Sequence, residues 1–259
     1  MKTQTKTIAV VLALFLVAAC FIGAASARDV AVGSDAFVYE TIKVTGTSVN
    51  ASTLAKYSGD ATPVVLNTIK ANSKGAFELL EAAVGTYTGV YRVNGNANET
   101  INIWYPEMSL KAYLGATSYD TIDGKTITKS SEVRFVVESS KVGAATSTAA
   151  GGLNPAVRVL FTTPVGGKTT DFGLTPISGG WDTANFDNLY FNGSVQIISA
   201  VAKPGDNANA GTYVAQAEFK GADSASGAFP GIPDKYKKSN TISFTVQSTS
   251  LTLTANKDS

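Results

Sequence analysis

Short runs of alternating or β-branched residues, each bounded by turn-forming residues, recur along almost the whole chain. Successive side chains of a strand point to opposite faces, so these runs predict half-buried strands at a spacing typical of β-sandwiches. The runs are Ala36–Val44, Val64–Ile69, Thr86–Val93, Thr100–Tyr105, Ser109–Leu114, Glu132–Glu138, Ala156–Phe161, Ser194–Val201, Thr212–Phe219, Thr241–Val246 and Ser250–Thr254. The sequence therefore predicts an all-β protein of the sandwich type.

Two segments carry a different local signal. Phe77–Val84 is the one stretch that predicts a helix, and it is short. Tyr119–Thr128 predicts a β-hairpin, because Asp123-Gly124 supplies the positive φ angles that a tight turn between two strands requires.

An internal repeat is visible in the sequence. Gly85-Thr86-Tyr87 and Gly211-Thr212-Tyr213 each open a strand, and the later stretches Ile101–Leu114 and Ile242–Ala255 align without a gap. The shared order of these elements favours duplication over chance. We expect Tyr87 and Tyr213 to be structural, each with its hydroxyl bonded to nearby backbone as in a tyrosine corner.

The repeat sets the predicted domain boundaries. We expect a signal peptide in residues 1–27, one immunoglobulin-like β-sandwich in 28–106, a second in 107–247 and a separate strand in 248–259. In the first copy the strand after the repeat opens the second domain, whereas the second copy has no such domain to open. The last strand is therefore expected to pair with a neighbouring subunit. Folding back onto its own second domain is the alternative.

The first residues have the features of a secretory signal peptide. Lys2 and Lys6 precede an apolar run from Ile8 to Gly23, and small residues then offer a cleavage site between Ala27 and Arg28. The run is shorter than the roughly 20 apolar residues of a spanning helix, so a permanent membrane anchor is less favoured. We expect an extracellular mature chain without a membrane span.

Cys20 provides a second interpretation of the leader. Val17–Cys20 is similar to a lipoprotein cleavage box, after which Cys20 would become the lipidated first residue. An intact-mass measurement of the mature N-terminus distinguishes lipidation from cleavage before Arg28.

The composition excludes several kinds of chemistry. The chain has no histidine and one cysteine, which lies in the leader, so zinc sites of the Cys/His type, thiolate nucleophiles and imidazole bases are excluded from the mature chain. A net charge of +1 gives no reason to expect nucleic acid or an anionic membrane as a partner. Charged residues make up 16%, against roughly 25% in ordinary soluble domains, as expected of a surface largely covered by other protein or of an uncharged polar monomer.

Two groups of polar residues are candidate sites. Asn50, Asn98 and Asn192 each begin an Asn-x-Ser/Thr sequence and are glycosylation candidates, with chance occurrence as the alternative. Loops rich in Asp and Asn contain weak calcium candidates, although their spacing matches no known calcium loop and side-chain capping of turns explains them better. These candidates are Asp182, Asp187 and Asp206. We expect no metal and no cofactor.

No pattern identifies a catalytic site, so the chain is not expected to be an enzyme. Glycoside hydrolysis needs a pair of carboxylates, but nothing in the spacing of Glu78, Glu81 and Glu107 singles out a pair. A secreted or lipid-anchored carbohydrate-binding module is the alternative function, and its platform would use aromatic residues that a sandwich core would otherwise bury. Those residues are Trp104, Tyr105, Trp181, Tyr190 and Phe191.

Several loose motifs follow one another in a set order. They are Asp35–Thr45, the strand Gly85–Tyr91 with two aromatics, the proline-bearing step Pro106–Leu110, a hairpin, and Ser131–Val137. In that order they resemble the surface-layer glycoproteins of methanogenic archaea, over roughly residues 28 to 220. The resemblance implies an exported cell-envelope protein with β-sandwich domains that self-assembles and has no catalytic site.

The resemblance also suggests how copies join. Surface-layer proteins usually have a threonine-rich stalk and a C-terminal apolar segment, and neither is found in this sequence before Ser259. The resemblance therefore favours the sheath subunit of filamentous methanogens such as Methanospirillum. That sheath is an amyloid-like β structure. The expected partner is a further copy, joined head to tail, and other envelope proteins are a second class of partner. Leu251 and Leu253 are the assembly-strand candidates, and the next copy's edge near Ala36–Val44 is the expected acceptor.

Overall fold

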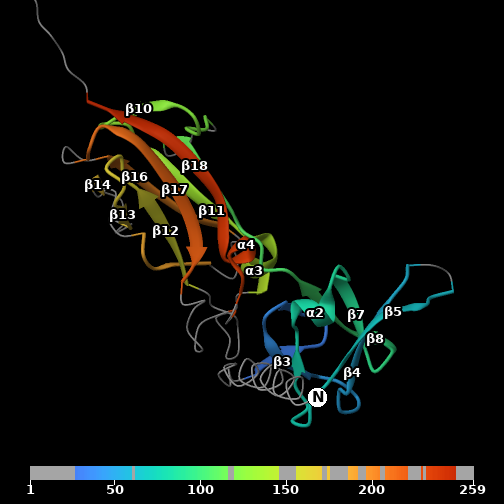
Figure 1. Ribbon diagram of the computed structural model, residues 1–259. Coiled ribbons are helices and arrows are strands. Elements are labelled where there is room, and N and C mark those ends of the chain that lie inside the picture. The colour runs from blue at the N-terminus through green and yellow to red at the C-terminus, as the bar shows by residue number, and fades with distance from the viewer. Residues whose placement is uncertain are drawn as a thin grey trace, which may run out of the picture. The chain divides into compact units, whose positions relative to one another are not determined.

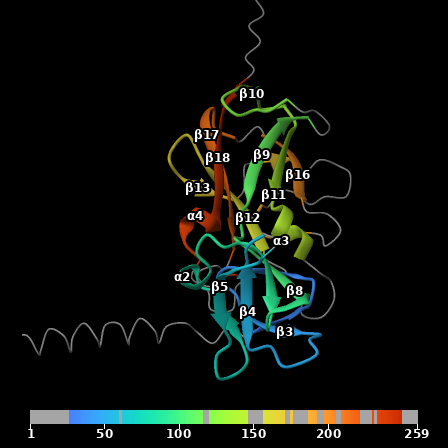
Figure 2. The same ribbon diagram turned by 90° about the vertical axis from the view of Figure 1, so that its right-hand side faces the viewer.

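The computed structural model describes residues 27–59, 62–115, 120–145, 156–170, 174–175, 186–191, 197–204, 208–220, 229 and 232–248. Most of these residues are in β-strands and few are in helices, which confirms the predicted all-β, sandwich-like class. They form two units (Figures 1 and 2). Unit 1 holds the described residues of Met1–Tyr105 and Gly221–Pro233, and unit 2 holds those of Pro106–Thr148, Leu153–Lys220 and Asp234–Ser259.

Unit 1 contains two sheets, with the strand orders β1-β3-β6 and β2-β8-β7-β4-β5. The short strand β2 pairs in parallel with β8, whereas β4 and β7 pair with their neighbours in antiparallel. The elements are β1 (Arg28–Ala31), β2 (Asp35–Phe37), β3 (Thr41–Thr45), β4 (Thr53–Tyr57), β5 (Val65–Lys70), β6 (Phe77–Glu78), α2 (Glu81–Val84), β7 (Gly89–Val93) and β8 (Asn96–Trp104).

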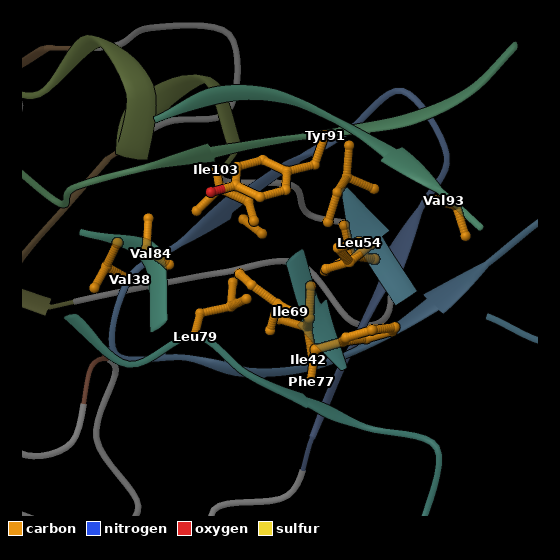
Figure 3. Packing of buried hydrophobic residues seen from close by; sticks show 13 residues of the cluster. Val38, Ile42, Leu54, Ile69, Phe77, Leu79, Val84, Tyr91, Val93 and Ile103 are labelled. Atoms are coloured by element: carbon orange, nitrogen blue, oxygen red, sulfur yellow. The ribbon is translucent and has the colours of Figure 1, made fainter. Parts of the chain in front are cut away.

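Side chains from both sheets of unit 1 meet in one apolar core (Figure 3). Ile42 of β3 and Phe77 of β6 come from one sheet. Leu54 of β4, Tyr91 of β7 and Ile103 of β8 come from the other. All five are fully buried, so the alternating runs place every second side chain inside, as in sheet-on-sheet packing.

Unit 2 also contains two sheets, with the orders β14-β16-β11-β9 and β10-β18-β17-β12-β13, and β15 pairs with β12 in addition. The elements are β9 (Ser109–Leu114), β10 (Thr126–Thr128), β11 (Val133–Glu138), α3 (Ser140–Ala145), β12 (Ala156–Thr162), β13 (Lys168–Thr169), β14 (Leu174–Thr175), β15 (Leu189–Tyr190), β16 (Ile197–Pro204), β17 (Gly211–Phe219), α4 (Asp234–Lys237) and β18 (Lys238–Gln247).

Aromatic rings dominate the core of unit 2. Phe135 of β11 is 1% exposed and meets Phe161 of β12 edge-on, with ring centroids 5.2 Å apart. Phe186 lies against both, at 5.6 Å from Phe135 and 5.2 Å from Phe161. β11 and β12 belong to different sheets, so this cluster joins the two layers of the unit.

A residue from far along the chain completes the core of unit 1. Phe229 falls between β17 and β18 in sequence, yet it belongs to unit 1 and is 1% exposed. Its ring meets that of the fully buried Phe37 edge-on at 5.7 Å. Unit 1 is therefore not one continuous stretch of sequence.

The two units share one strand order. The described strands of each unit can be numbered from the first strand of that unit. The longer sheet then has the same order in both units: second, last, last-but-one, fourth and fifth strand. This order is β2-β8-β7-β4-β5 in unit 1 and β10-β18-β17-β12-β13 in unit 2. In both units the second strand pairs in parallel with the last. The sequence repeat thus corresponds to a repeated topology.

The equivalent tyrosines of the repeat are Tyr91 and Tyr213. The hydroxyl of Tyr91 donates to the carbonyl oxygen of Tyr87 at 2.6 Å, and that of Tyr213 donates to the carbonyl oxygen of Asn209 at 3.0 Å, each four residues earlier. The expectation for Tyr213 is confirmed. The expectation for Tyr87 is wrong, because its side chain is 41% exposed and its carbonyl is the acceptor.

The β-ladders also correct the register of the repeat. Tyr91 lies opposite Ile101, and Tyr213 lies opposite Phe244. Ile101 therefore corresponds to Phe244 and not to Ile242, two residues earlier. The gapless sequence alignment is therefore wrong by two residues. A shift of two residues keeps apolar side chains on the same face of the strand, so the alternating pattern cannot reveal it.

Replacing Tyr91 with phenylalanine is expected to flatten the loss of stability at alkaline pH. Burial raises the pKa of the Tyr91 hydroxyl above its ordinary value of about 10, against the opposing effect of the Asn67 hydrogen bond. The unfolded chain then releases the hydroxyl proton at a lower pH than the folded chain. The contribution of Tyr91 to the free energy of unfolding is therefore fully present below about pH 10 and is lost as the pH rises through the folded pKa. Phenylalanine removes this contribution.

Urea unfolding at about pH 8 and about pH 11 checks this expectation. Tyr91→Phe should cost roughly 1 kcal/mol at the lower pH, through the lost hydrogen bond, and show a smaller drop at the higher pH. Tyr87→Phe is the matched control, because its exposed side chain is not the donor. Equal behaviour of the two variants would contradict the assignment.

Two local predictions are wrong in part. Phe77 and Glu78 form β6, which pairs with β3, and helix α2 covers only Glu81–Val84. The turn at Asp123-Gly124 is present, but Thr126–Thr128 pairs in parallel with β18 and not with the residues before the turn. The single predicted helix is joined by α3 and α4. For Phe77–Glu78 and Thr126–Thr128 a strand distant in sequence overrides the local signal.

Candidate assembly edge

The edges of the four sheets determine where another chain can pair, because an edge strand presents unpaired backbone N–H and C=O groups. Most of the edge strands are too short to hold a partner strand. β6, β13, β14 and β15 have two residues each, β2 and β10 have three, and β1 has four. Of the edge strands within the described ranges, β5 and β9 alone reach six residues.

A side chain occupies the edge of β9. Asn240 of β18 accepts a hydrogen bond from the Leu110 N–H and donates one to the Leu110 carbonyl oxygen, both at 2.9 Å. Asn240 directly follows Ser239, which lies where the register between β17 and β18 shifts. The hydroxyl oxygen of Ser239 accepts a hydrogen bond from the Ala217 N–H there, at 2.9 Å. The amide of Asn240 thus takes the place that a partner strand would need beside Leu110.

β4 and β5 form a hairpin, the β4–β5 arm, that extends past the strand beside it (Figure 1). β5 pairs with β4 between Lys70 and Val65, but β7 pairs with β4 only at Leu54 and Ala55. The distal part of the arm is therefore a two-stranded ribbon. Such a ribbon is only marginally stable in water unless something else covers it.

The outer strand of the arm is apolar and exposed. Val64, Val65 and Leu66 follow one another and are 62%, 49% and 43% exposed. β5 has no charged residue before Lys70, at its end. Natural edge strands are normally protected by charge, proline or a bulge. β5 has one of these features, a register shift that leaves Leu66 without a partner in β4, and its ladder with β4 is regular from Asn67 to Lys70.

The inner side of β5 fixes the arm to unit 1. Ile69 is 5% exposed and joins the core cluster. The Asn67 amide donates to the Ala83 carbonyl oxygen at 2.8 Å and to the Tyr91 hydroxyl oxygen at 3.1 Å. Thr68, on the other face, is exposed. The base of the arm is thus held in place while its outer edge is accessible.

The expected acceptor edge at Ala36–Val44 is divided between two short strands, so no single edge spans it. β2 ends at Phe37, and the chain then turns, with Tyr39 at a φ of 77°, into β3. β3 lies between β1, which pairs with Ile42–Thr45, and β6, which pairs with Thr41 and Ile42. The alternating pattern continues across the turn, which is why the sequence suggests one long strand where there are two short ones.

The predicted cleavage site lies where the described fold begins. Ala27 directly precedes β1, which starts at Arg28. The Arg28 guanidinium donates to both carboxylate oxygens of Glu40, at 2.9 Å and 2.8 Å. Glu40 is 8% exposed and also accepts the Phe37 N–H at 2.8 Å. Arg28 is therefore part of the folded unit.

The glycosylation candidates differ in position. Asn50 lies between β3 and β4 and is exposed, and Asn98 is exposed within β8. Both are thus open to solvent. Asn192 lies outside the described residues. So do the assembly-strand candidates Leu251 and Leu253.

The calcium candidates are not brought together in the described part of the chain. Asp187 forms an ion pair with Lys220, with Oδ2 and Nζ 2.5 Å apart. Asp182 and Asp206 fall outside the described residues. No group of three or more Asp, Glu, His or Cys side chains that would suit a metal ion occurs among the residues described.

The aromatic candidates for a sugar platform differ in position where they are described. The Trp104 indole N–H donates to Asp35 Oδ1 at 2.9 Å, and Phe191 is 4% exposed. Tyr190 is 51% exposed, and Trp181 is outside the described ranges. Among the carboxylates, Glu81 accepts the Tyr39 hydroxyl at 2.6 Å.

Comparisons with known proteins add no relative. Within the described ranges, no helix has the length and apolarity to cross a membrane. A scan against protein-family models finds no match, and a search of curated proteins finds no significantly similar sequence.

Proposed function

We propose that this chain is a structural protein that is exported and assembles with further copies of itself through β-strand pairing between subunits. β5 carries the proposal, as a six-residue edge strand that begins with the exposed Val65 and Leu66, follows the exposed Val64 and has no charge before Lys70. Monomeric proteins avoid such an edge because it pairs readily with another chain. In a protein whose function is to pair, the same edge is useful.

We infer that each unit is an immunoglobulin-like sandwich, so that the chain is a tandem of two such domains. In that fold strands A, B, E and D form one sheet and strands G, F and C the other. The orders β9-β11-β16-β14 and β18-β17-β12 in unit 2 support this assignment, as does β8-β7-β4 in unit 1. Tyr213 and Tyr91, near the starts of β17 and β7, then occupy the tyrosine-corner position.

Export and placement in the envelope rest on the sequence. The leader favours cleavage between Ala27 and Arg28, and this cleavage keeps the Arg28–Glu40 ion pair in the mature chain. The resemblance to surface-layer and sheath proteins of methanogenic archaea supports an extracellular, non-enzymatic role. The exposed Asn50 and Asn98 are accessible to glycosylation in that location.

A hollow on unit 2 favours a second candidate function, carbohydrate binding by a secreted or lipid-anchored module. It has a volume of about 520 Å³, lies over β12 and β17, and is lined by polar and charged groups that include Arg158, Gln216 and Glu218. The residues described as lining it include no aromatic ring on which a sugar could stack. Self-assembly is therefore the better-supported function.

Electron microscopy of the purified secreted chain tests the proposal. Ordered hoops, tubes or sheets are expected, since subunits joined by repeated strand pairing form a lattice. A chain that stays monomeric in size-exclusion chromatography at every concentration tried would refute self-assembly. Saturable glycan binding by that monomer would favour the second candidate.

A further inference from the structure

We propose that β5 of one copy is the acceptor for the C-terminal segment Ser250–Thr254 of the next copy, which adds a strand to the outer edge of the β4–β5 arm. This inference rests on the proposed function and names the two surfaces that meet. It replaces the edge at Ala36–Val44, which the structure divides between the three-residue edge strand β2 and the inner strand β3.

The acceptor follows from comparing every described edge. A partner of five residues needs an edge of similar length, and within the described ranges this leaves β5 and β9. Asn240 already hydrogen-bonds both backbone groups of Leu110 in β9. The backbone of β5 pairs with one strand only, β4. On its other side the Thr68 N–H donates to Oδ1 of the neighbouring Asn67 at 2.8 Å, a local contact that a partner strand would displace, whereas both backbone groups of Leu110 are held by a residue of another strand. β5 is thus the edge on which a further strand fits.

The donor follows from the sequence of the segment. Ser248–Ala255 contains no charge and no proline, so nothing in it opposes strand pairing. Leu251 and Leu253 share one face of an extended chain, and Thr252 and Thr254 share the other. In an extended conformation the segment would therefore present one apolar row and one threonine row.

The two faces of the donor match the two faces of β5. Ile69 of β5 points into the core of unit 1, so Leu251 and Leu253 would extend that apolar face. Thr68 lies on the exposed face, where Thr252 would form a cross-strand threonine pair. The exposed Val65 would lose contact with water beside the added strand.

The pairing has a direct consequence for geometry. Each copy contributes one donor and one acceptor, which are different surfaces, so the contact is heterologous and propagates into rings or filaments. Pairing of two β5 strands with each other would instead be self-complementary and would end at a dimer.

Disulfide trapping tests the pairing directly. In a Cys20→Ser background the engineered thiols are the only ones in the chain. We expect Thr68→Cys and Thr252→Cys proteins, mixed under mild oxidation, to form a mixed disulfide. Thr126→Cys, on the short edge strand β10, is the matched control and should not cross-link to Thr252→Cys. A disulfide dimer of Thr68→Cys alone would overturn the inference in favour of β5 self-pairing.

A charge on the acceptor provides the second test. Val65→Lys should abolish ordered assembly in electron microscopy while leaving the unfolding midpoint unchanged, because the side chain is 49% exposed. Val49→Lys, at a site 61% exposed and outside the strands, should assemble normally. Assembly of Val65→Lys would refute β5 as acceptor and leave self-assembly intact. Failure of the unaltered chain to assemble would refute the proposed function itself.

Discussion

Ending the chain at Gln247 is expected to abolish ordered assembly and to leave both units folded. β18 ends at Gln247, and the described core contacts and ladders lie before that point. Deleting residues 248–259 removes the donor strand that we propose for the contact between copies. Electron microscopy should then show no tubes or sheets, while circular dichroism and the urea midpoint match those of the complete chain.

A shorter deletion serves as the control. A chain that ends at Ala255 keeps Ser250–Thr254 and loses the charged tail Lys257–Asp258, and it should assemble like the complete chain. Normal tubes from the Gln247 truncation would refute the donor assignment. A lower unfolding midpoint of that truncation would instead indicate that the segment folds back onto unit 2 of its own chain.

Phe135→Ala should cause the largest loss of stability of any single substitution considered for unit 2. The ring is 1% exposed and lies at the centre of a cluster with Phe161 and Phe186, at centroid distances of 5.2 Å and 5.6 Å. Truncating such a side chain loses its burial and leaves a cavity, which typically costs about 3 to 5 kcal/mol. A loss of this size is comparable to the whole stability of many domains.

Urea unfolding followed by circular dichroism measures this effect. Leu114→Ala is the matched control, because Leu114 lies in the same sheet but is 40% exposed, and it should stay within about 0.5 kcal/mol of the unaltered chain. A cost below about 1 kcal/mol for Phe135→Ala would mean that the three rings do not form the packed centre of the unit.

Periodicity predicts the well-paired strands and misses those with mixed side chains. Ser109–Leu114 coincides with β9, because both of its faces follow the alternating pattern. β4 (Thr53–Tyr57) escapes notice, since its sequence TLAKY has no clear alternation, yet Leu54 is fully buried. The turn at Tyr39 is missed because a positive φ in a residue other than glycine leaves little trace in sequence.

The candidate assembly edge could not be predicted, because whether a strand is an edge depends on the order of all strands in its sheet. The sequence predicts a strand at Val64–Ile69 but not that β4 is its one described neighbour. The protection of β9 rests on Asn240, 130 residues later in the chain. The register of the repeat also needs the ladders, since a matching Gly-Thr-Tyr string points to Tyr87 while Tyr91 is the buried residue.

The place of Phe229 in unit 1 links the folding of that unit to the completion of synthesis. Residues 27–105 are synthesised early, but the partner of Phe37 follows more than a hundred residues later. Domains usually fold in order of emergence, and contacts of long sequence separation form slowly. The first unit of a partial or clipped chain would keep Phe37 uncovered. Only chains that extend past Phe229 would then have a finished first unit, so a chain that stops earlier can be told from a complete one by the stability of that unit alone.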